Sequence, residues 1–409
     1  MKLALPSENL VNADSTGVSG RLAGNRRSLR VLHVVNRLDM GGTEYGILKV
    51  IAGLGNDEFE HRLCAIRGFQ PGLASRPELS HKVVVASEKE SGFQFLLFRL
   101  ARIMRAFRPH IVHSRNWGAI EAIPAARLAG VPVAIHSEHG YELDMLAGLP
   151  ARRRMLRRGV YMMADAVFAV TGELRNYHER QTGAASWSIR VIRNGVDTAR
   201  FAPRPDIRAD VRRKFKIPAR SFVFGSVGRI VPIKDHATML KAAIALVQRN
   251  VDVRVLLAGS GPELASLEQF VESNSELRNR VTFLGAYYNI PEVLTAMDVF
   301  VLPSISEGMS NTILEAMASG LPVVATRVGG NPELVEENRA GWLFTPGNVT
   351  ELVHQLEDLA HLSELRRQMG EASRRRAVSE FSLERMIADY RNLYWELATR
   401  RGITIESED

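Results

Sequence analysis

The stretch DVFVLPSISEGMSNTILEAMASGLPVVAT, residues 298–326, decides the fold class of this 409-residue chain. Its apolar run 299–303 predicts a buried strand, and the run 323–326 predicts another. Between them a helix is expected over residues 311–319, with Asn311 or Ser310 as its N-cap and Gly320 as its C-cap. A strand, a loop, a helix and a second strand in this order form one unit of a parallel sheet.

The loop of this unit carries one acid, Glu307, and a second acid, Glu315, follows about one turn into the helix. The free N–H groups and the positive dipole of a helix N-terminus attract anions, so a diphosphate can bind there. The two carboxylates would then flank the anion and accept hydrogen bonds from sugar hydroxyls. An ordinary strand–helix–strand unit has the same features, so this stretch alone leaves both interpretations open.

The whole chain has the composition of an ordinary globular protein, with 45% hydrophobic and 24% charged residues. Its length suits two or three domains. The single cysteine, Cys64, excludes an intramolecular disulfide framework and is typical of a reducing compartment. No segment reaches the roughly 20 apolar residues of a membrane span. Residues 1–28 lack the apolar core of a signal peptide, so we expect a disordered arm there and a cytoplasmic protein.

Apolar runs that predict strands alternate with helical patterns in two successive blocks. The first block has such runs at residues 30–36, 62–66, 82–86, 110–114, 132–136, 166–170 and 189–192. The second has them at 222–227, 252–258, 281–284, 299–302, 323–325 and 341–344. This alternation predicts an α/β fold with two doubly wound sheets of about six parallel strands each. Segment 193–207 contains Asn-Gly and two prolines and is the expected connection, which gives domains over residues 29–200 and 201–382.

The last helix is expected over residues 383–400. Its apolar residues recur at steps of three and four, so they form one stripe that must be buried. They are Leu383, Met386, Ile387, Tyr390, Leu393, Tyr394 and Leu397. Because this helix follows the completed second sheet, we expect it to cross back onto the first domain.

Basic residues outnumber acidic residues, 53 to 45, and they gather in two segments of the first block. Arg99–Arg108 carries four arginines at steps of three, and Arg152–Arg158 carries five. Solvated outer faces of helices would show the same pattern. The functional alternative is attraction to anionic lipid head groups or to a diphosphate-bearing lipid. Nucleic acid is not expected, because the sequence has no DNA-binding motif and no basic stretch interleaved with aromatic residues.

In open parallel sheets, ligands bind at the carboxyl ends of the strands, so polar residues after each strand are site candidates. In the first block these are a glycine pair before a helix and residues after later strands: Gly41, Gly42, Thr43, Glu44, Asn116, His136 and His139. Paired glycines let a backbone approach a phosphate or a sugar closely. The two histidines are spaced like metal ligands, but no third ligand has suitable spacing, so we predict no metal.

The second block has cations where its first strand ends. Arg229 can bind two phosphate oxygens, and Lys234 adds a point charge near the start of the next helix. The motif Gly259-Ser260-Gly261-Pro262 follows the second strand but lacks the third glycine of a dinucleotide fingerprint, so a nicotinamide cofactor is not expected. Leu284 ends the third strand and is placed to border a base.

Together, in this order and spacing, the motifs resemble those of retaining GT-B glycosyltransferases of the bacterial glycosyl group 1 type, family 4. The resemblance covers about residues 30–400. It rests on Gly41-Gly42, Glu138-His139-Gly140, Asn194-Gly195-Val196-Asp197, Gly228-Arg229 with Lys234, Gly259-Ser260-Gly261-Pro262 and Glu307-x7-Glu315. It implies two Rossmann-like domains that face each other across a cleft.

The resemblance also implies residue roles. Arg229 and Lys234 would hold the diphosphate of a nucleotide sugar, Glu315 its ribose, and Glu307 the hydroxyls of the transferred sugar. His139, with His136 as the alternate, would lie beside that sugar. Further donor contacts would come from Gly41, Gly42, Gly228, Gly259, Leu284, Gly308, Met309, Ser310 and Asn311. The acceptor is expected near Thr43, Glu44, Asn116 and His136. Neither a metal ion nor a cofactor is required.

We therefore expect a hexosyltransferase that uses a UDP- or GDP-sugar and retains the configuration of the sugar. The expected acceptor is a saccharide linked to a lipid diphosphate, in the assembly of exopolysaccharide or another cell-surface glycan. This places the protein in the cytoplasm or peripherally on the inner face of the cell membrane. Two alternatives stay open: a nucleotide-sugar 2-epimerase of the same fold, and a non-catalytic subunit that binds a nucleotide sugar.

Overall fold

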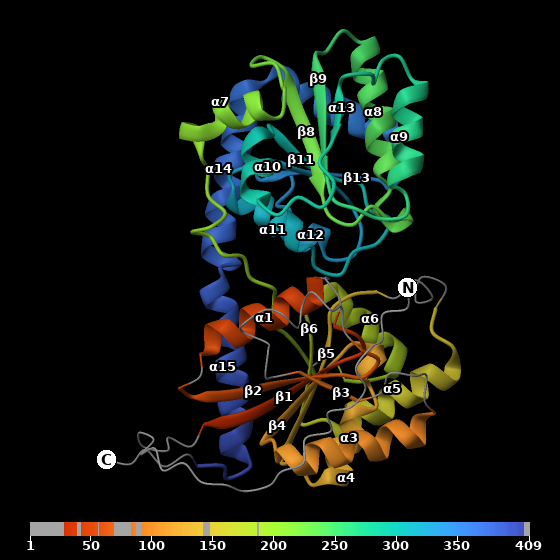
Figure 1. The fold of residues 1–409 in the computed structure, drawn as a ribbon, viewed down its shortest axis with the longest axis vertical. Helices are drawn as coiled ribbons and strands as arrows, with labels where there is room; N and C mark the ends of the chain where they lie inside the picture. Colours follow the sequence, from red (N-terminus) through yellow and green to blue (C-terminus); the bar gives the residue numbers. More distant parts are fainter. Residues whose placement is uncertain are drawn as a thin grey trace, which may run out of the picture.

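A computed structural model (Figure 1) describes residues 28–38, 42–55, 57–68, 83–86, 92–141, 148–185 and 188–404. The described chain forms two lobes, each built around one parallel sheet with helices on both faces. We call them the first lobe and the second lobe. None of the helices in the described part has both the length and the apolarity needed to cross a bilayer.

The first lobe has seven parallel strands in the order β3-β2-β1-β4-β5-β6-β7. The strands are β1 (Leu29–Val35), β2 (Phe59–Ala65), β3 (Val83–Val85), β4 (Ile111–Arg115), β5 (Val133–Glu138), β6 (Ala166–Ala169) and β7 (Ile189–Val191). The helices are α1 (Gly42–Leu54), α3 (Phe93–Phe107), the short 3-10 helix η1 (Trp117–Ala119), α4 (Ala122–Ala129), α5 (Ala151–Met163) and α6 (Gly172–Thr182).

The second lobe has six parallel strands in the order β10-β9-β8-β11-β12-β13. The strands are β8 (Phe222–Val227), β9 (Val253–Ala258), β10 (Val281–Phe283), β11 (Val299–Leu302), β12 (Val323–Thr326) and β13 (Gly341–Phe344). The helices are α7 (Pro205–Lys214), the 3-10 helix η3 (Pro232–Lys234), α8 (His236–Gln248), α9 (Leu264–Ser273), α10 (Ile290–Ala296), α11 (Asn311–Ala318), α12 (Asn331–Leu334), α13 (Val349–His361) and α14 (Ser363–Glu380).

In both sheets the strand order reverses beside the first strand. The reversal lies between β1 and β4 in the first lobe and between β8 and β11 in the second. Ligands of such sheets bind outside the carboxyl ends of the strands at this switch point. Every predicted strand is present, and the first sheet has seven rather than about six. The prediction placed the start of β2 at residue 62, whereas the strand begins at Phe59. Its first residues alternate buried and exposed side chains, so they do not form an apolar run.

The C-terminal helix α15 (Leu383–Arg400) packs on the first lobe, as predicted, and Figure 1 shows it continuing from α14 down the side of the molecule. Its stripe of Met386, Tyr390, Leu393, Tyr394 and Leu397 is buried in one cluster with strands of the first sheet. The chain therefore passes between the lobes twice.

The two crossings touch each other. Val196 of the first crossing donates its N–H to the oxygen of Phe381 at 2.9 Å, and its own oxygen accepts from the N–H of Leu383 at 2.9 Å. A Cβ atom on the neighbouring Gly195 would lie 2.7 Å from the backbone oxygen of Ser382, so only glycine fits. The connection expected at residues 193–207 is thus one half of a paired crossing.

Candidate active site

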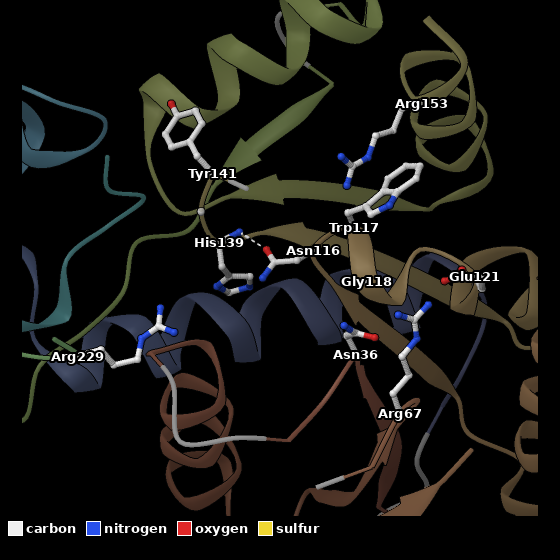
Figure 2. A pocket seen from close by; sticks show the side chains of 11 residues that line it. Asn36, Arg67, Asn116, Trp117, Gly118, Glu121, His139, Tyr141, Arg153 and Arg229 are labelled. Carbon is white, nitrogen blue, oxygen red and sulfur yellow. Dashed lines mark hydrogen bonds between the residues drawn. The ribbon is translucent and has the colours of Figure 1, made fainter. Parts of the chain in front are cut away.

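A cavity of about 570 Å³ opens where the two switch points face each other, and its walls come mainly from the first lobe. Figure 2 shows Arg229 of the second lobe reaching in from one side, with His139 beside it and Asn36, Arg67 and Glu121 farther away. The lining residues are Asn36, Arg67, Asn116, Trp117, Gly118, Glu121, His139, Gly140, Tyr141, Arg153 and Arg229.

Arg229 follows two strand ends that lie unusually close together. Gly228 and Gly259 both have positive φ angles, 145° and 154°. A Cβ atom at position 259 would lie 1.7 Å from the backbone oxygen of Gly228, so any side chain there would separate β8 from β9. The glycines therefore set the direction in which the chain leaves β8, and the exposed Arg229 follows at the cavity edge.

Lys234 and Glu307 form an ion pair near this edge. The Lys234 Nζ lies 2.5 Å from Glu307 Oε1, and the Ser304 hydroxyl donates to the same oxygen at 2.6 Å. Both charged side chains are mostly buried, with 18% and 10% exposed. The sequence assigned the lysine to phosphate and the glutamate to sugar, and the structure brings the two into direct contact.

The glutamate loop ends at the N-terminus of α11. The Ser310 hydroxyl caps this helix by accepting from the N–H of Ile313 at 3.3 Å. Asn311, the first helical residue, donates from Nδ2 to the oxygen of Gly42 at 3.3 Å. Gly42 is itself the first residue of α1, so two helix N-termini meet across the cleft and both favour an anion there.

Gly308 and Met309 join the loop to the first lobe. A Cβ atom at position 308 would lie 2.4 Å from the backbone oxygen of His139, so the loop can contact the histidine motif only through glycine. Met309 is buried, and its sulfur lies 3.1 Å from the N–H of Asn194 in the crossing. The Met309 side chain therefore packs against the connection and does not line the cavity.

Glu315 lies on α11 in a group of charges that spans both lobes. Burial raises the pKa of Glu315 from its ordinary value of 4.5 to about 7, although Lys49 and Arg200 lower it. Burial also lowers the pKa of Lys49, against the opposing charges of Glu315 and Asp197. Lys49 was not predicted, because an isolated lysine in a helix carries no signal of its partner in another domain.

His139 lines the cavity, and hydrogen bonds hold it at both the backbone and the ring. Its N–H donates to Asn116 Oδ1 at 2.7 Å, and its Nε2 lies 2.8 Å from the Ser137 hydroxyl. Burial and the nearby charge of Arg115 together lower the pKa of His139 to about 3, although Glu138 opposes both effects. The imidazole is therefore neutral at physiological pH.

The alternate histidine, His136, is fully buried within β5 and does not line the cavity. Its Nδ1 lies 2.7 Å from the Ser114 hydroxyl, and its Nε2 lies 3.3 Å from Glu138 Oε1. Of the two predicted histidines, the structure thus places only His139 at the cavity.

The remaining residues predicted for the site do not line the cavity or lie outside the described residues. Leu284 is half-buried after β10, and Glu44 is half-buried on α1 outside the cavity lining. Gly41 and the side chain of Thr43 lie outside the described residues. In the described part of the chain, no group of three or more His, Cys, Asp or Glu side chains is arranged to hold a metal ion.

Six side chains of the cavity were not predicted from the sequence: Asn36, Arg67, Trp117, Glu121, Tyr141 and Arg153. Asn36 Oδ1, Glu121 Oε2 and Tyr141 OH are buried and have no hydrogen-bond partner among the described residues. The Arg153 guanidinium lies over the Trp117 ring, 4.4 Å from its centroid. Asn36 and Arg67 do follow strands, but single polar residues at strand ends are too common to be singled out.

Comparison with known proteins supplies the remaining observations. The sequence matches the family model "Glycosyltransferase Family 4" over residues 40–200 and "Glycosyl transferases group 1" over residues 207–376. It is 30% identical over 301 residues to the GDP-mannose-dependent alpha-(1-6)-phosphatidylinositol monomannoside mannosyltransferase of Mycobacterium tuberculosis, covering 70% of this chain and 77% of that one.

A second relative is the UDP-Gal:alpha-D-GlcNAc-diphosphoundecaprenol alpha-1,3-galactosyltransferase of Escherichia coli. It is 29% identical over 319 residues, which cover 75% of this chain and 80% of the relative. Among solved structures, Anabaena HepE in complex with UDP superposes with a TM-score of 0.79 at 21% identity, covering 90% of this chain and all of that one. At that identity the likeness bears on the fold alone, and it confirms the expected GT-B architecture.

Proposed function

The chain belongs to the family 4 glycosyltransferases of the glycosyl transferases group 1, and we propose that it moves a hexose from a UDP- or GDP-sugar to a saccharide acceptor with retention of configuration. The observation that carries this proposal is the meeting, in one cleft, of two helix N-termini, Arg229, the Lys234–Glu307 pair and His139. Each lobe supplies part of this group.

The donor half of the site suits a sugar nucleotide. Departure of a nucleoside diphosphate builds negative charge, and fixed cations and helix-end N–H groups stabilise such charge electrostatically. We assign this role to Arg229, Lys234 and the first turn of α11, with no metal ion required. Glu307 would accept hydrogen bonds from the transferred sugar, and Glu315 from the ribose. Because Lys234 already contacts Glu307, it would orient that carboxylate and contribute charge beside the phosphates.

The neutral imidazole of His139 suits a contact with the sugar better than a base. A histidine with its pKa near 3 does not take up a proton at physiological pH. The acceptor hydroxyl would therefore lose its proton to the departing phosphate, on the same face from which it attacks. That arrangement would retain the configuration of the sugar.

The acceptor half corresponds to the cavity of the first lobe. The buried oxygens of Asn36, Glu121 and Tyr141 are placed to accept from, or donate to, saccharide hydroxyls. Arg67 and Arg153 add positive charge on the same walls and suit a phosphate. The names of the two relatives mention a diphosphoundecaprenol and a phosphatidylinositol acceptor, which supports a lipid-linked phosphate for this chain.

The outer helices of the first lobe support contact with an anionic membrane. Helices α3, α4 and α5 contain no acidic residue, and they pack side by side. Eight of the thirteen exposed large hydrophobic side chains among the described residues lie on them: Phe93, Phe95, Phe98, Leu128, Met155, Leu156, Met162 and Met163. We propose that this surface, which we call the α3–α5 surface, rests on the inner face of the cell membrane while the enzyme extends a surface glycan or exopolysaccharide.

The structure divides the arginines of this surface into two groups. Arg99, Arg102 and Arg105 are exposed on α3 and Arg108 directly after it. Arg152, Arg154 and Arg158 are exposed on α5. Arg153 lines the cavity, and Arg157 is fully buried beside Glu138 at 2.9 Å. Only the exposed group can face lipid head groups, so the predicted segment 152–158 contributes three of its five arginines.

The decisive experiment incubates the purified full chain with UDP- or GDP-hexoses, in the presence and absence of a polyprenyl-diphosphate saccharide. A glycosyltransferase gives an extended acceptor and free nucleoside diphosphate, with the anomeric configuration retained. Epimerised donor in the absence of acceptor would instead favour a 2-epimerase. Donor binding in a thermal-shift assay with no product of either kind would favour a non-catalytic subunit.

A further inference from the structure

We propose that Tyr394 of the crossing helix α15 is a positioning residue for His139, acting through a buried chain of hydrogen bonds that fixes the imidazole proton on Nδ1. The inference rests on the proposed function, in which His139 lies beside the donor sugar. Tyr394 itself touches neither the cavity nor His139, and it is fully buried beneath the first sheet.

This series of hydrogen bonds has three links with short donor–acceptor distances. The Tyr394 hydroxyl lies 2.8 Å from His113 Nδ1, and His113 Nε2 lies 2.9 Å from the Ser137 hydroxyl. That hydroxyl lies 2.8 Å from His139 Nε2. Tyr394, His113 and Ser137 are fully buried, so no water competes for these bonds.

The Tyr394 hydroxyl gives the hydrogen-bond chain its direction. Among the described residues its partner is His113 Nδ1 at 2.8 Å, and its burial leaves no water to take its proton. Because a buried hydroxyl proton needs an acceptor, it points to His113 Nδ1. Because His113 is buried beside Arg115, which lowers its pKa, it is neutral and carries a single ring proton, on Nε2.

The same logic continues to the cavity. His113 Nε2–H donates to the Ser137 oxygen, so the Ser137 proton is available for another acceptor. It has two choices, His139 Nε2 at 2.8 Å and the backbone oxygen of Ser114 at 3.4 Å, and the shorter contact is the better bond. His139 Nε2 then accepts, and its ring proton lies on Nδ1.

The reverse direction of donation, from His139 toward Tyr394, is less favourable. If His139 carried its proton on Nε2, the serine would have to donate either to the Ser114 oxygen, at the longer distance of 3.4 Å, or to His113 Nε2. In the second case His113 Nδ1–H would donate to Tyr394, and the tyrosine proton would have no acceptor among the described residues, in a fully buried position. A buried donor without a partner costs more than a hydrogen bond contributes, so the forward direction is favoured.

The consequence for the site is a histidine that can only donate to its ligand. Within the described residues Nδ1 of His139 has no protein partner, and Figure 2 shows the ring in the cavity between Arg229 and Asn116. A fixed Nδ1–H in that place presents a hydrogen bond to an oxygen of the donor sugar or its phosphate. The helix that returns from the second lobe thus helps to set the proton position at the active site.

The test is a long-range ¹⁵N–¹H correlation spectrum of the full chain labelled with ¹⁵N-histidine, which distinguishes the two neutral tautomers. The His139 signals are assigned from their loss in His139→Asn. Wild type should show His139 protonated on Nδ1, and both Tyr394→Phe and Ser137→Ala should populate the Nε2–H form. Tyr390→Phe is the matched control, because Tyr390 is also buried on α15 and its ring packs beside that of Tyr394, but its hydroxyl lies outside this series of hydrogen bonds.

Kinetics supply the second readout. Tyr394→Phe should lower kcat at least tenfold while the KM for the donor changes less than twofold, and Tyr390→Phe should change neither. Wild-type His139 protonated on Nε2, or equal effects of the two tyrosine variants, would overturn the proposal. The spectrum needs no turnover, so it stays informative if no transfer occurs. A loss of transfer in Tyr394→Phe without any change of tautomer would also overturn it.

Discussion

At the scale of single residues, the contact between Lys234 and Glu307 is the feature most directly tied to transfer. Replacing Glu307 with glutamine keeps the shape of the side chain but removes its charge, and it leaves Lys234 without its partner. We expect Glu307→Gln to lower kcat/KM about 100-fold or more, because stabilisation of a sugar and of a leaving group depends on fixed charges in a partly buried site. Initial rates with saturating acceptor measure this.

A matched control is the ion pair between Lys214 and Glu292, at 2.8 Å in the same lobe and away from the cleft. Glu292→Gln also removes one carboxylate charge and should leave the transfer rate unchanged. Circular dichroism should show native folding for both variants. Retention of more than a tenth of wild-type activity in Glu307→Gln would remove the assigned role.

Glu315 gives a prediction about pH. Its pKa is about 7 in the fold and about 4.5 when unfolded, so between these values the folded chain binds more protons than the unfolded chain. The free energy of unfolding should therefore fall as the pH rises from about 4.5 to about 7, and this loss persists above pH 7. Glu315→Gln should remove this dependence and stabilise the protein at pH 8 by roughly 3 kcal/mol at most. Urea unfolding of both proteins at pH 5 and pH 8 checks it.

The same substitution separates stability from binding. The carboxylate form of Glu315, proposed to accept from the ribose, predominates only above about pH 7. Donor affinity of the wild type should thus decline below that pH, whereas Glu315→Gln should bind the donor weakly at every pH. Parallel stability profiles for the two proteins would contradict the assigned titration.

These residues also show what a sequence can predict at this scale. Glu307, Arg229 and His139 were found because each follows a strand at the edge where ligands bind. The pairing of Lys234 with Glu307 was not predictable, because residues 73 positions apart meet only when β8 and β11 are neighbours. Nor could the sequence choose between His136 and His139, since the choice depends on where β5 ends.

At the scale of elements, strands were predictable because parallel strands between two helical layers are apolar along their whole length. Their neighbours in the sheet do not follow from the sequence. The clearest element-level prediction concerns the α3–α5 surface, where exposed aromatic and methionine side chains stand among arginines and no acid. Such a surface combines apolar insertion with attraction to anionic lipid.

We expect the triple variant Phe98→Ser, Met162→Ser, Arg154→Glu to bind vesicles containing phosphatidylglycerol at least tenfold less than the wild type. Binding by the wild type should also weaken at high salt. Sedimentation with vesicles measures both. The control variant is Tyr288→Ser, Leu362→Ser, which removes exposed apolar side chains from the second lobe and should bind as the wild type does. Equal sedimentation of all three proteins would contradict a membrane role.

At the scale of the whole molecule, the relative placement of the two lobes was the feature least predictable from the sequence. The crossing helix was predictable from its apolar stripe, but the residues that join the lobes across the cleft were not. Gly308 contacts His139 and Asn311 contacts Gly42, yet neither residue has a pattern that names its partner. The position of the domain boundary near residue 200 stays a prediction.

Glu333 offers a way to test how the lobes are held together. It lies on α12 of the second lobe, and its carboxylate accepts from the N–H groups of Gly172 and Glu173, at 3.0 Å and 2.7 Å, at the start of α6 in the first lobe. A carboxylate at a helix N-terminus is favoured by the free N–H groups and by the dipole. Here the capping carboxylate and the helix belong to different lobes, so the contact holds the two lobes together.

Glu333→Ala should therefore loosen the lobes without unfolding either of them. Helix α6 keeps its own cap, since the Thr171 hydroxyl still accepts from the N–H of Leu174 at 3.1 Å. The loss of stability should be about 1 kcal/mol, whereas kcat should fall roughly tenfold, because a site assembled from both lobes depends on their closure. Small-angle X-ray scattering should report a larger radius of gyration. Glu351→Ala, which removes a carboxylate contact within the second lobe alone, should leave both quantities unchanged. An unaltered radius together with unaltered kinetics in Glu333→Ala would mean that the paired crossings alone hold the lobes in place.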